Sequence, residues 1–567
     1  MRRSRAARPD VKRRFTGQHS TIHDSTATFE HRSAAPDGAV SFSGAKEVGR
    51  DDPPGPAAQD DPPGPAAQVE PFRTPDGEVF ATVPVGSRRE TLAIRSGSMR
   101  SWVRYRHWQR FGEPMPSGEV RDAIETLASQ GEFGPTVHPV HLRVASHVGA
   151  LFLDLANSRG QVVEITAGGW EVVTDPPVRF VRPPGMRPLP VPVRGGTIED
   201  LRPFLNITDQ DSWVLFVGAL LAAFSPTGPH FILVLQGEQA SAKSTTARVF
   251  RRLVDPARSP LRAPPRNQRD LLVAAKHSWI VGLDNISLIS DRLSDALCRL
   301  STGGGFSTRT LYTDQDETVL DACRPVVLTG IADLATRGDL RDRAITLDME
   351  PIAAERRRTE ADLWVAFEKV RPMILGAICD ALACALRQVD EVSVDQLPRM
   401  ADAARWISAA EVALAWTPGT FAAAYTRNRR ESLAQARDDS PLVGPILALI
   451  ESGPWSGPAN ELLARLGELA SAAERADPDW PKTPRKLTAE LKRLNPALRD
   501  AGLEWLRLRR TGTARLHRIT RLEAASSPAD AVTTTDTSGA VVPDDGDAED
   551  DGSEASGSNR HPASGVK

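Results

Sequence analysis

The sequence predicts an α/β core, a parallel β-sheet with flanking helices, from two observations in the middle of the chain. Apolar residues over 231–235 are followed by the pattern G-x-x-x-x-A-K-S over 237–244 and then by a helical run. A second apolar run, 278–283, ends in Asp284 and Asn285. Unbroken apolar runs are typical of buried parallel strands, and the loop pattern between strand and helix is typical of phosphate binding. We therefore expect a P-loop NTPase core.

The length and composition favour several domains. The chain has 567 residues and a formal net charge of −3, so any basic surface for nucleic acid must be local. The predicted organisation is a disordered tail with a tandem nonapeptide over 1–70, a small α+β domain over 71–196, the P-loop ATPase core over 197–350, a helical lid or linker over 351–439, a winged-helix-like domain over 440–523 and a disordered acidic tail over 524–567.

Cysteine spacing and hydropathy favour a cytoplasmic protein without membrane contact. The 4 cysteines show neither C-x-x-C spacing nor nearby histidines, which favours reduced, buried thiols over a metal site. The basic N-terminal stretch is not followed by an apolar segment, as a secretory signal would be. The longest apolar run, 214–224, is too short to cross a bilayer and indicates a buried helix.

The region before the core predicts two helices and then a small sheet. The nonapeptide DDPPGPAAQ at 51–59 recurs at 60–68, which indicates duplication within a linker. Helices are expected over 99–111 and from Ser117, and strands over 140–144, 150–155, 162–165 and 170–173. The first helix mixes arginines with aromatic residues. We favour packing against a core, and the alternative is stacking on single-stranded nucleic acid.

The phosphate loop supplies the predicted nucleotide contacts. Lys243 would reach the β- and γ-phosphates, and the Ser244 hydroxyl together with Asp284 would hold Mg²⁺. Ala242 replaces the second glycine of the common pattern, but it adds only a methyl group, so we expect the loop to close. The residues expected to bind the nucleotide are Gly237, Glu238, Gln239, Ala240, Ser241, Ala242, Lys243, Ser244 and Thr245.

Four further residues are catalytic candidates. Asn285 follows the Walker B residue Asp284 and can orient a water molecule but cannot accept its proton, which leaves the speed of hydrolysis open. Thr329 ends a third apolar strand, 324–330, where a sensor would contact the γ-phosphate. Arg341 or Arg343 would act as an arginine finger on a neighbour's nucleotide, or would form ion pairs within its own subunit.

In this order, the motifs resemble a known ATPase module. The phosphate loop, the Asp-Asn pair, T-G-G-G-F-S-T-R-x-L-Y over 302–312, the sensor strand and D-L-x-D-R-A over 339–344 resemble superfamily 3 helicases. The similarity is greatest to poxvirus-type primase–helicase proteins and their relatives in bacterial phages and integrated elements. It implies an ATP-hydrolysing homo-oligomeric ring that draws single-stranded DNA through a pore, with Arg309 as the basic contact. Thr329 stands where that family usually has Asn, and Asn285 where an acid is usual. No primase constellation is visible, so primase activity is not predicted.

The C-terminal region predicts a winged helix. Helices are expected over 359–370, 372–387 and 400–415, and then over 441–450, 459–469 and 485–494, with a turn at 455–457 and strands over 503–508 and 516–522. Three helices and a hairpin with local basic density favour DNA over a protein partner. The predicted contacts are Lys482, Arg485 and Lys486 at the recognition helix and Arg509 and Arg510 in the wing.

Together these features predict an ATP- and Mg²⁺-dependent DNA motor, a replicative helicase-like ATPase of phage or mobile-element origin that works with replication proteins. One alternative is a nucleotide-switched DNA-binding regulator with slow or no hydrolysis. Another is an ATPase that acts on protein partners.

Overall fold

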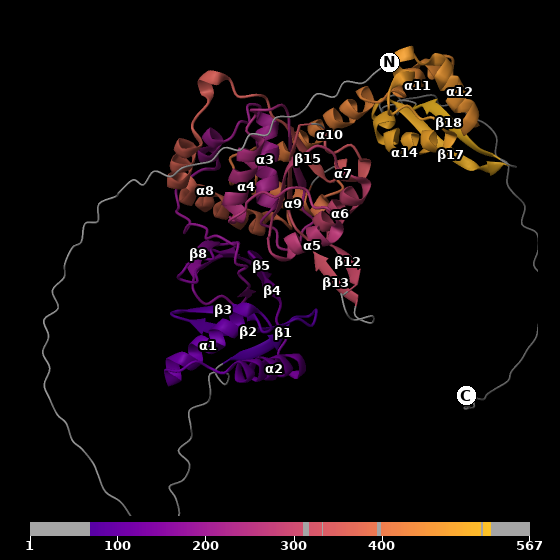
Figure 1. Cartoon of the computed structure of the whole chain (residues 1–567). Helices are drawn as coiled ribbons and strands as arrows, with labels where there is room; N and C mark the ends of the chain where they lie inside the picture. Colours follow the sequence, from indigo (N-terminus) through magenta and orange to yellow (C-terminus); the bar gives the residue numbers. More distant parts are fainter. Residues whose placement is uncertain (1–68, 310–316, 332, 394–397, 512–513, 523–567) are drawn as a thin grey trace, which may run out of the picture. The chain divides into compact units, whose positions relative to one another are not determined.

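The computed structural model describes residues 69–309, 317–331, 333–393, 398–511 and 514–522 (Figure 1). The tandem nonapeptide and the acidic run of the predicted C-terminal tail lie outside these residues. Among the described residues no helix is long and apolar enough to cross a membrane.

The first folded region contains a sheet that the sequence analysis missed. Strands β1 (Glu70–Arg73), β2 (Val79–Val85) and β3 (Arg88–Ala93) form an antiparallel sheet in that order. Helices α1 (Gly97–Phe111) and α2 (Ser117–Phe133) follow, as predicted, and pack with the sheet around Ile94, Met99 and Ile124 (Figure 1). Strand β3 reads RRETLA, which has too few apolar residues to show a strand pattern.

A second sheet follows, and one predicted strand in it is wrong. Strands β5 (Val144–His147), β6 (Ala150–Asp154), β7 (Val162–Thr166) and β8 (Gly169–Val173) form an antiparallel meander. The run 140–144 is not one strand, because β4 (Val140–His141) pairs in parallel with β9 (Arg179–Phe180) in a separate sheet. The break lies at Arg143, whose buried guanidinium donates to the carbonyl oxygen of Asp154.

The predicted parallel sheet is confirmed. Strands β10 (Ile232–Gln236), β11 (Val281–Ile286), β14 (Val326–Gly330) and β15 (Ala344–Asp348) pair in parallel in the order β11-β14-β10-β15. Successive side chains of β10 lie on opposite faces of the sheet. Leu233 and Leu235 belong to one apolar cluster, and Ile232 and Val234 belong to another. Both faces are therefore buried, and the carboxyl ends of all four strands share one edge.

Helices cover the two faces of this sheet. The first cluster includes residues of α3 (Gln210–Ala222), α4 (Lys243–Val254) and α8 (Glu360–Gln388). The second includes residues of α5 (Gln268–Lys276) and α6 (Asp291–Thr302). The predicted separate helices over 359–370 and 372–387 are wrong, because α8 continues through Pro372. Phe367, Ile374 and Leu375 are fully buried on either side of this proline, and their packing favours one helix despite the lost hydrogen bond.

The glycine-rich segment after α6 forms the first strand of a hairpin. Strand β12 (Gly304–Arg309) pairs antiparallel with β13 (Glu317–Ala322), which places Gly304 and Gly305 in a strand. The backbone of Arg309 lies opposite Glu317, and its side chain lies outside the described part. Further elements complete this region: α7 (Gly338–Arg341), the short 3₁₀ helices η2 (Ile198–Phe204) and η3 (Ala354–Arg356), α9 (Ala401–Ala410) and α10 (Thr420–Asp438).

The last described region combines helices with a three-stranded sheet around its own core. It comprises α11 (Val443–Glu451), β16 (Trp455–Pro458), α12 (Ala459–Leu469), α13 (Ala472–Ala476), α14 (Pro484–Asp500), β17 (Leu503–Thr511) and β18 (Ala514–Arg521). The predicted turn at 455–457 is wrong, because β16 pairs with β18 along the edge opposite β17. Buried Ile446, Leu462 and Leu487 belong to this core. The predicted helices and the hairpin are present, and the assignment as a winged helix stays a prediction.

Candidate functional site

The turn between β10 and α4 has an unusual backbone conformation, with positive φ angles and a close approach to another segment of the chain. Gly237 has φ 135°, and a Cβ at this position would lie 2.2 Å from the carbonyl oxygen of Met349, so only glycine fits. Ala240 and Ala242 are left-handed, with φ 64° and 62°. Ala242 caps α4, whose first backbone N–H groups face this turn at the carboxyl edge of the sheet. Backbone N–H groups at a helix N-terminus are a common arrangement for binding anions in proteins.

Because Ala242 is left-handed, we expect Ala242→Gly to leave the free energy of unfolding unchanged or to raise it by up to about 1.5 kcal/mol. Relief of the left-handed penalty, about 1–2 kcal/mol, offsets the greater flexibility that glycine gives the unfolded chain, about 0.5–1 kcal/mol. Chemical denaturation measures the difference. Ala423→Gly is the control, because Ala423 is exposed inside α10 and its replacement should cost about 1 kcal/mol. A loss at Ala242 as large as the control's would contradict the strain argument.

Lys243 is held by its own loop. Its ammonium group donates to the carbonyl oxygen of Gly237 at 2.8 Å and to Ser241 Oγ at 3.0 Å, and also to the carbonyl oxygen of Glu238. Partial burial lowers the pKa of Lys243, and the charge of Asp284 opposes that shift. The positive charge therefore lies at the loop, beside the carboxylate of β11.

The carboxylate of Asp284 joins the ends of β11 and β14 to the first turn of α4. Ser244 Oγ donates to Asp284 Oδ1 at 2.7 Å, and the hydroxyl of Thr329 donates to the same oxygen. The backbone N–H of Asn285 donates to Thr329 Oγ1 at 3.1 Å. These contacts arise because β14, which ends near Thr329, lies between β10 and β11. Sequence reasoning placed these residues at one sheet edge without predicting that Thr329 binds Asp284.

The backbone around Asn285 is irregular. The pairing of β11 with β14 changes register between Leu283 and Ile286, and Asn285 has φ 56°. Asparagine tolerates this conformation better than most residues. The Asn285 side chain is exposed at the carboxyl edge of the sheet, next to Asp284. Its predicted function in orienting a water molecule stays a prediction.

The two candidate arginine fingers differ in burial. Arg341 is 7% exposed and lies 3.5 Å from Asp333 Oδ2, and burial lowers its pKa. Arg343 is only partly buried and donates to the carbonyl oxygen of Asp339 at 2.8 Å. Arg341 thus pairs within its own chain, and Arg343 is the less buried of the two. Both finger functions stay predictions.

The predicted DNA contacts at the helix α14 lie together on the surface. Lys482, Arg485 and Lys486 are exposed around the first turn of this helix, where Thr483 accepts the backbone N–H of Lys486 at 3.3 Å. The side chains of Arg509 and Arg510 in β17 lie outside the described part of the chain.

A pocket beside the phosphate loop was not predicted. It has a volume of about 730 Å³, and Ala242 and Thr245 form one wall. Phe204, Ile352 and Leu363 give it an apolar side. Asn206 also lines the pocket, and its Nδ2 donates to the carbonyl oxygens of Ser241 at 3.2 Å and Glu350 at 2.6 Å. No sequence signal marks this pocket, because its walls come from segments far apart in the chain.

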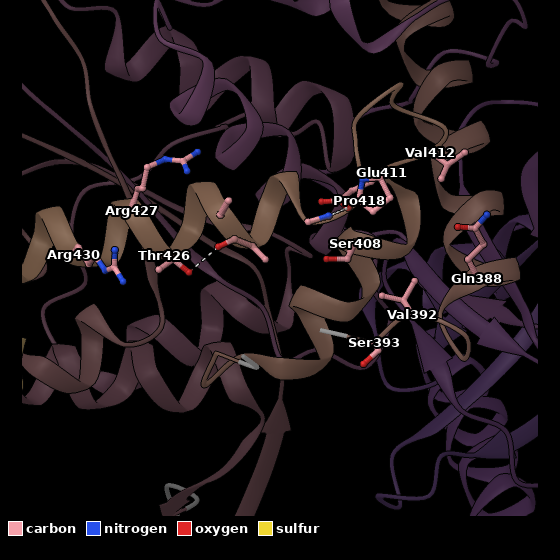
Figure 2. A pocket seen from close by; sticks show the side chains of 13 residues that line it. Gln388, Val392, Ser393, Ser408, Glu411, Val412, Pro418, Thr426, Arg427 and Arg430 are labelled. Carbon is pink, nitrogen blue, oxygen red and sulfur yellow. Dashed lines mark hydrogen bonds between the residues drawn. The ribbon is translucent and has the colours of Figure 1, made fainter. Parts of the chain in front are cut away.

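A second pocket, of about 820 Å³, lies among α8, α9 and α10 and shares no lining residue with the phosphate loop (Figure 2). Figure 2 shows Glu411 next to Pro418 at the start of α10. The Glu411 carboxylate accepts the backbone N–H groups of Gly419 at 2.7 Å and Phe421 at 2.8 Å. Burial raises the pKa of Glu411, which caps α10. We assign this pocket no function.

Behind the site, a buried ionic cluster joins the meander to α4. Arg143, Arg251 and Asp255 are each at most 2% exposed. Arg143 Nε lies 3.3 Å from Asp255 Oδ1, and Arg251 lies 3.2 Å from Asp255 Oδ2. Asp255 also accepts the backbone N–H groups of Trp279 at 3.0 Å and Ile280 at 3.2 Å. Sequence reasoning missed this cluster, whose only local signal is the i, i+4 spacing of Arg251 and Asp255.

A phosphate loop between a parallel strand and a helix, with a carboxylate from another strand of the same sheet at its mouth, defines a P-loop-like α/β core. Residues 198–437 match the model of the actinomycete integrative conjugative element replication protein family. Residues 442–535 match the model of the C-terminal domain of that family. These two stretches thus identify a replication protein of a mobile element.

Other comparisons give only distant similarity. No curated protein matches. The structure of the active helicase Cch of SCCmec type IV aligns at 11% identity over 80% of this chain and 93% of that chain, with a TM-score of 0.43. The apo structure of the NrS-1 C-terminal region aligns at 11% identity over 80% and 96%, with a TM-score of 0.36. The JCV helicase aligns at 14% identity over 40% and 62%, with a TM-score of 0.21. At these values the likeness carries no argument about activity.

Proposed function

We propose that this protein is an ATP-hydrolysing DNA motor, a helicase-like ATPase that serves replication of a mobile element. The observation that carries the proposal is the contact between Ser244 Oγ and Asp284 Oδ1 at 2.7 Å, directly beside Lys243. It places a hydroxyl, a carboxylate and an ammonium group at the N-terminus of α4. The match to a family of replication proteins supports DNA as the substrate.

The residues present fit a nucleotide with Mg²⁺. The Ser244 hydroxyl and the Asp284 carboxylate are hard oxygen donors, which Mg²⁺ prefers, and their 2.7 Å contact supports a site in which both would bind one ion. Lys243 and the N–H groups of α4 would bind phosphate oxygens, and the pocket beside Ala242 and Thr245 would take the nucleoside. Mg²⁺, when bound, would neutralise charge on the phosphates. Thr329 would hold the carboxylate of Asp284 in place.

The basic cluster at the start of α14 supports DNA binding. Lys482, Arg485 and Lys486 place positive charge at the N-terminal end of a helix, where the helix dipole is already positive. No acidic residue lies in the first turn to offset this charge. Positive side chains at the positive end of a helix dipole destabilise the helix, and a bound phosphate group would offset this repulsion. DNA is therefore a better partner for this surface than an uncharged protein face.

Replacing Lys482, Arg485 and Lys486 by alanine should weaken DNA binding and flatten its salt dependence. If each cation neutralises one phosphate of duplex DNA, the slope of log K against log[salt] decreases in magnitude by about 2–3. The affinity measured from low to moderate salt gives this slope. Arg465→Ala in α12 is the control, because Arg465 is exposed and pairs with Glu468. An unchanged slope in the triple variant would refute DNA contact at this cluster.

The proposed function is tested by ATP turnover with and without single-stranded DNA, with the oligomeric state measured alongside and strand displacement measured next. A motor shows DNA-stimulated turnover and unwinding, and loses both in Lys243→Ala. ATP binding without DNA-stimulated turnover would exclude the motor. Turnover without any DNA binding would favour an ATPase that acts on protein partners.

A second candidate is a nucleotide-switched DNA-binding regulator. Asn285 favours it, because an amide beside Asp284 cannot take a proton from the attacking water. In a regulator, ATP would bind and change DNA affinity while turnover stays slow with DNA present. Asn285→Glu would then raise turnover, since it supplies the missing carboxylate. A wild-type protein whose turnover rises strongly with DNA would exclude the regulator.

A further inference from the structure

Helix α1 has one face in the core and one on the surface. Met99, Trp102 and Val103 are buried against the β1–β3 sheet, and Trp102 Nε1 donates to the carbonyl oxygen of Pro84 at 2.9 Å. Packing against a core, which the sequence favoured for this helix, therefore accounts for these residues. It does not account for the opposite face.

The opposite face carries exposed aromatic side chains. Tyr105, Trp108 and Phe111 are 55%, 55% and 50% exposed. The rings of Tyr105 and Trp108 are stacked, with centroids 6.3 Å apart and an interplanar angle of 25°. Exposing three large rings on a single helix costs hydrophobic free energy unless a partner covers them. Because these rings are about half exposed, another planar ring can stack on them.

The charge of α1 selects the kind of partner. Arg100 and Arg104 are exposed, and helical spacing places them on the same face as Trp108 and Phe111. Helix α1 contains no Asp or Glu. The neighbouring α2 has the opposite balance, with Glu119, Asp122, Glu125 and Glu132 against Arg121. Basic charge in this helix pair is thus concentrated where the rings are exposed, which favours a polyanion that also carries planar groups.

We propose that this face of α1, with Arg100, Arg104, Tyr105, Trp108 and Phe111, binds single-stranded nucleic acid. Bases would stack on the three rings and the arginines would contact phosphates, which is how proteins bind single strands without reading their sequence. This surface precedes the residues matched by the family models, 198–437 and 442–535, and is distinct from the cluster at α14. It gives the protein a second contact with a strand, outside the ATPase core, and it does not depend on ATP hydrolysis.

The test uses the full chain without nucleotide, so that a failure of ATP hydrolysis does not affect it. Oligothymidylate affinity is measured for the double variant Tyr105→Ala, Trp108→Ala, with circular dichroism as the check on folding. We expect a loss of about tenfold or more, since one stacked base contributes about 1–3 kcal/mol. Phe133→Ala is the control, because Phe133 is an 84% exposed ring on α2 and not on α1, and its replacement should leave affinity unchanged. An equal affinity in the double variant and the wild type overturns the proposal.

Two further measurements separate this surface from other DNA contacts and from other partners. Halogenated-uracil oligonucleotides, cross-linked by light, should label a peptide within 104–111, and labelling only elsewhere overturns the proposal. Arg100→Ala with Arg104→Ala should reduce the salt slope by about 1.4, whereas Arg121→Ala, 78% exposed on α2, should not. If a variant keeps its oligonucleotide affinity but no longer binds phosphatidylserine vesicles, the face binds a membrane instead. If it keeps that affinity but no longer self-associates, the face binds a second copy of the chain.

Discussion

Asp284→Asn should reduce DNA-stimulated ATP turnover by about 10²- to 10³-fold while the protein stays folded. Asparagine keeps an oxygen that can accept the hydroxyls of Ser244 and Thr329, so the contacts of this residue survive. It removes the negative charge that would hold Mg²⁺, and losing one aligned electrostatic group typically costs this much in rate. Steady-state turnover with saturating single-stranded DNA measures the effect, and ATP binding is measured separately.

Asp348→Asn provides the matched control. Asp348 ends β15 at the same sheet edge, next to the phosphate-loop strand, but its side chain is exposed and accepts from Gln236 Nε2 at 2.8 Å. We expect turnover within about twofold of the wild type, because exposed charges near a site contribute little. If Asp348→Asn reduced turnover as much as Asp284→Asn, general charge at the edge, and not a metal ligand, would explain the result.

Thr329→Val separates positioning from sensing. The Thr329 hydroxyl donates to Asp284 and accepts from the Asn285 backbone, so in the structure it holds the carboxylate. Valine keeps the shape of the side chain but leaves Asp284 with one fewer partner. A positioning residue raises the Mg²⁺ concentration needed for half-maximal turnover more than it lowers the maximal rate. A γ-phosphate sensor would show the reverse pattern.

The sequence predicted the elements of the site well because they are buried on both sides. Strands β10, β11 and β14 are short apolar runs, and parallel pairing brings their carboxyl ends to one edge. Ser244 and Asp284 therefore meet, although they lie 40 residues apart. The hydrogen bond from Thr329 to Asp284 was not predictable, because it depends on the strand order β11-β14-β10 and on a change in register within β11.

The failures of prediction also have physical causes. Pro372 suggested a helix end, but α8 is buried along much of its length and tertiary packing outweighs one missing hydrogen bond. Strand β12 was not predicted either, because Gly304 and Gly305 have low strand propensity and their partners in β13 are not visible in a local pattern. The cluster around Asp255 joins Arg143 to a residue 112 positions away, which no local pattern encodes.

Asp255→Asn should be the most destabilising single substitution among those considered, with a loss of about 3–5 kcal/mol in the free energy of unfolding. Arg143 and Arg251 are both buried against this carboxylate, and its removal leaves two buried positive charges without a negative partner. In this variant, a neutral amide would also replace the carboxylate that accepts the backbone N–H groups of Trp279 and Ile280. Denaturant unfolding followed by tryptophan fluorescence measures the loss.

An exposed ion pair gives the control for this prediction. Asp211 pairs with Arg427 on the surface, where both side chains are more than a third exposed, so Asp211→Asn should cost less than about 1 kcal/mol. If Asp255→Asn cost as little as Asp211→Asn, the buried cluster would not hold the meander against α4. The double variant Arg143→Met, Asp255→Asn should recover part of the loss, since it leaves one buried charge unpaired in place of two. Asp255 is the C-cap of α4, and the N-terminal end of the same helix follows the phosphate loop. Measuring ATP affinity in the same variants therefore shows whether loss of the buried cluster at one end of α4 affects the loop at the other end.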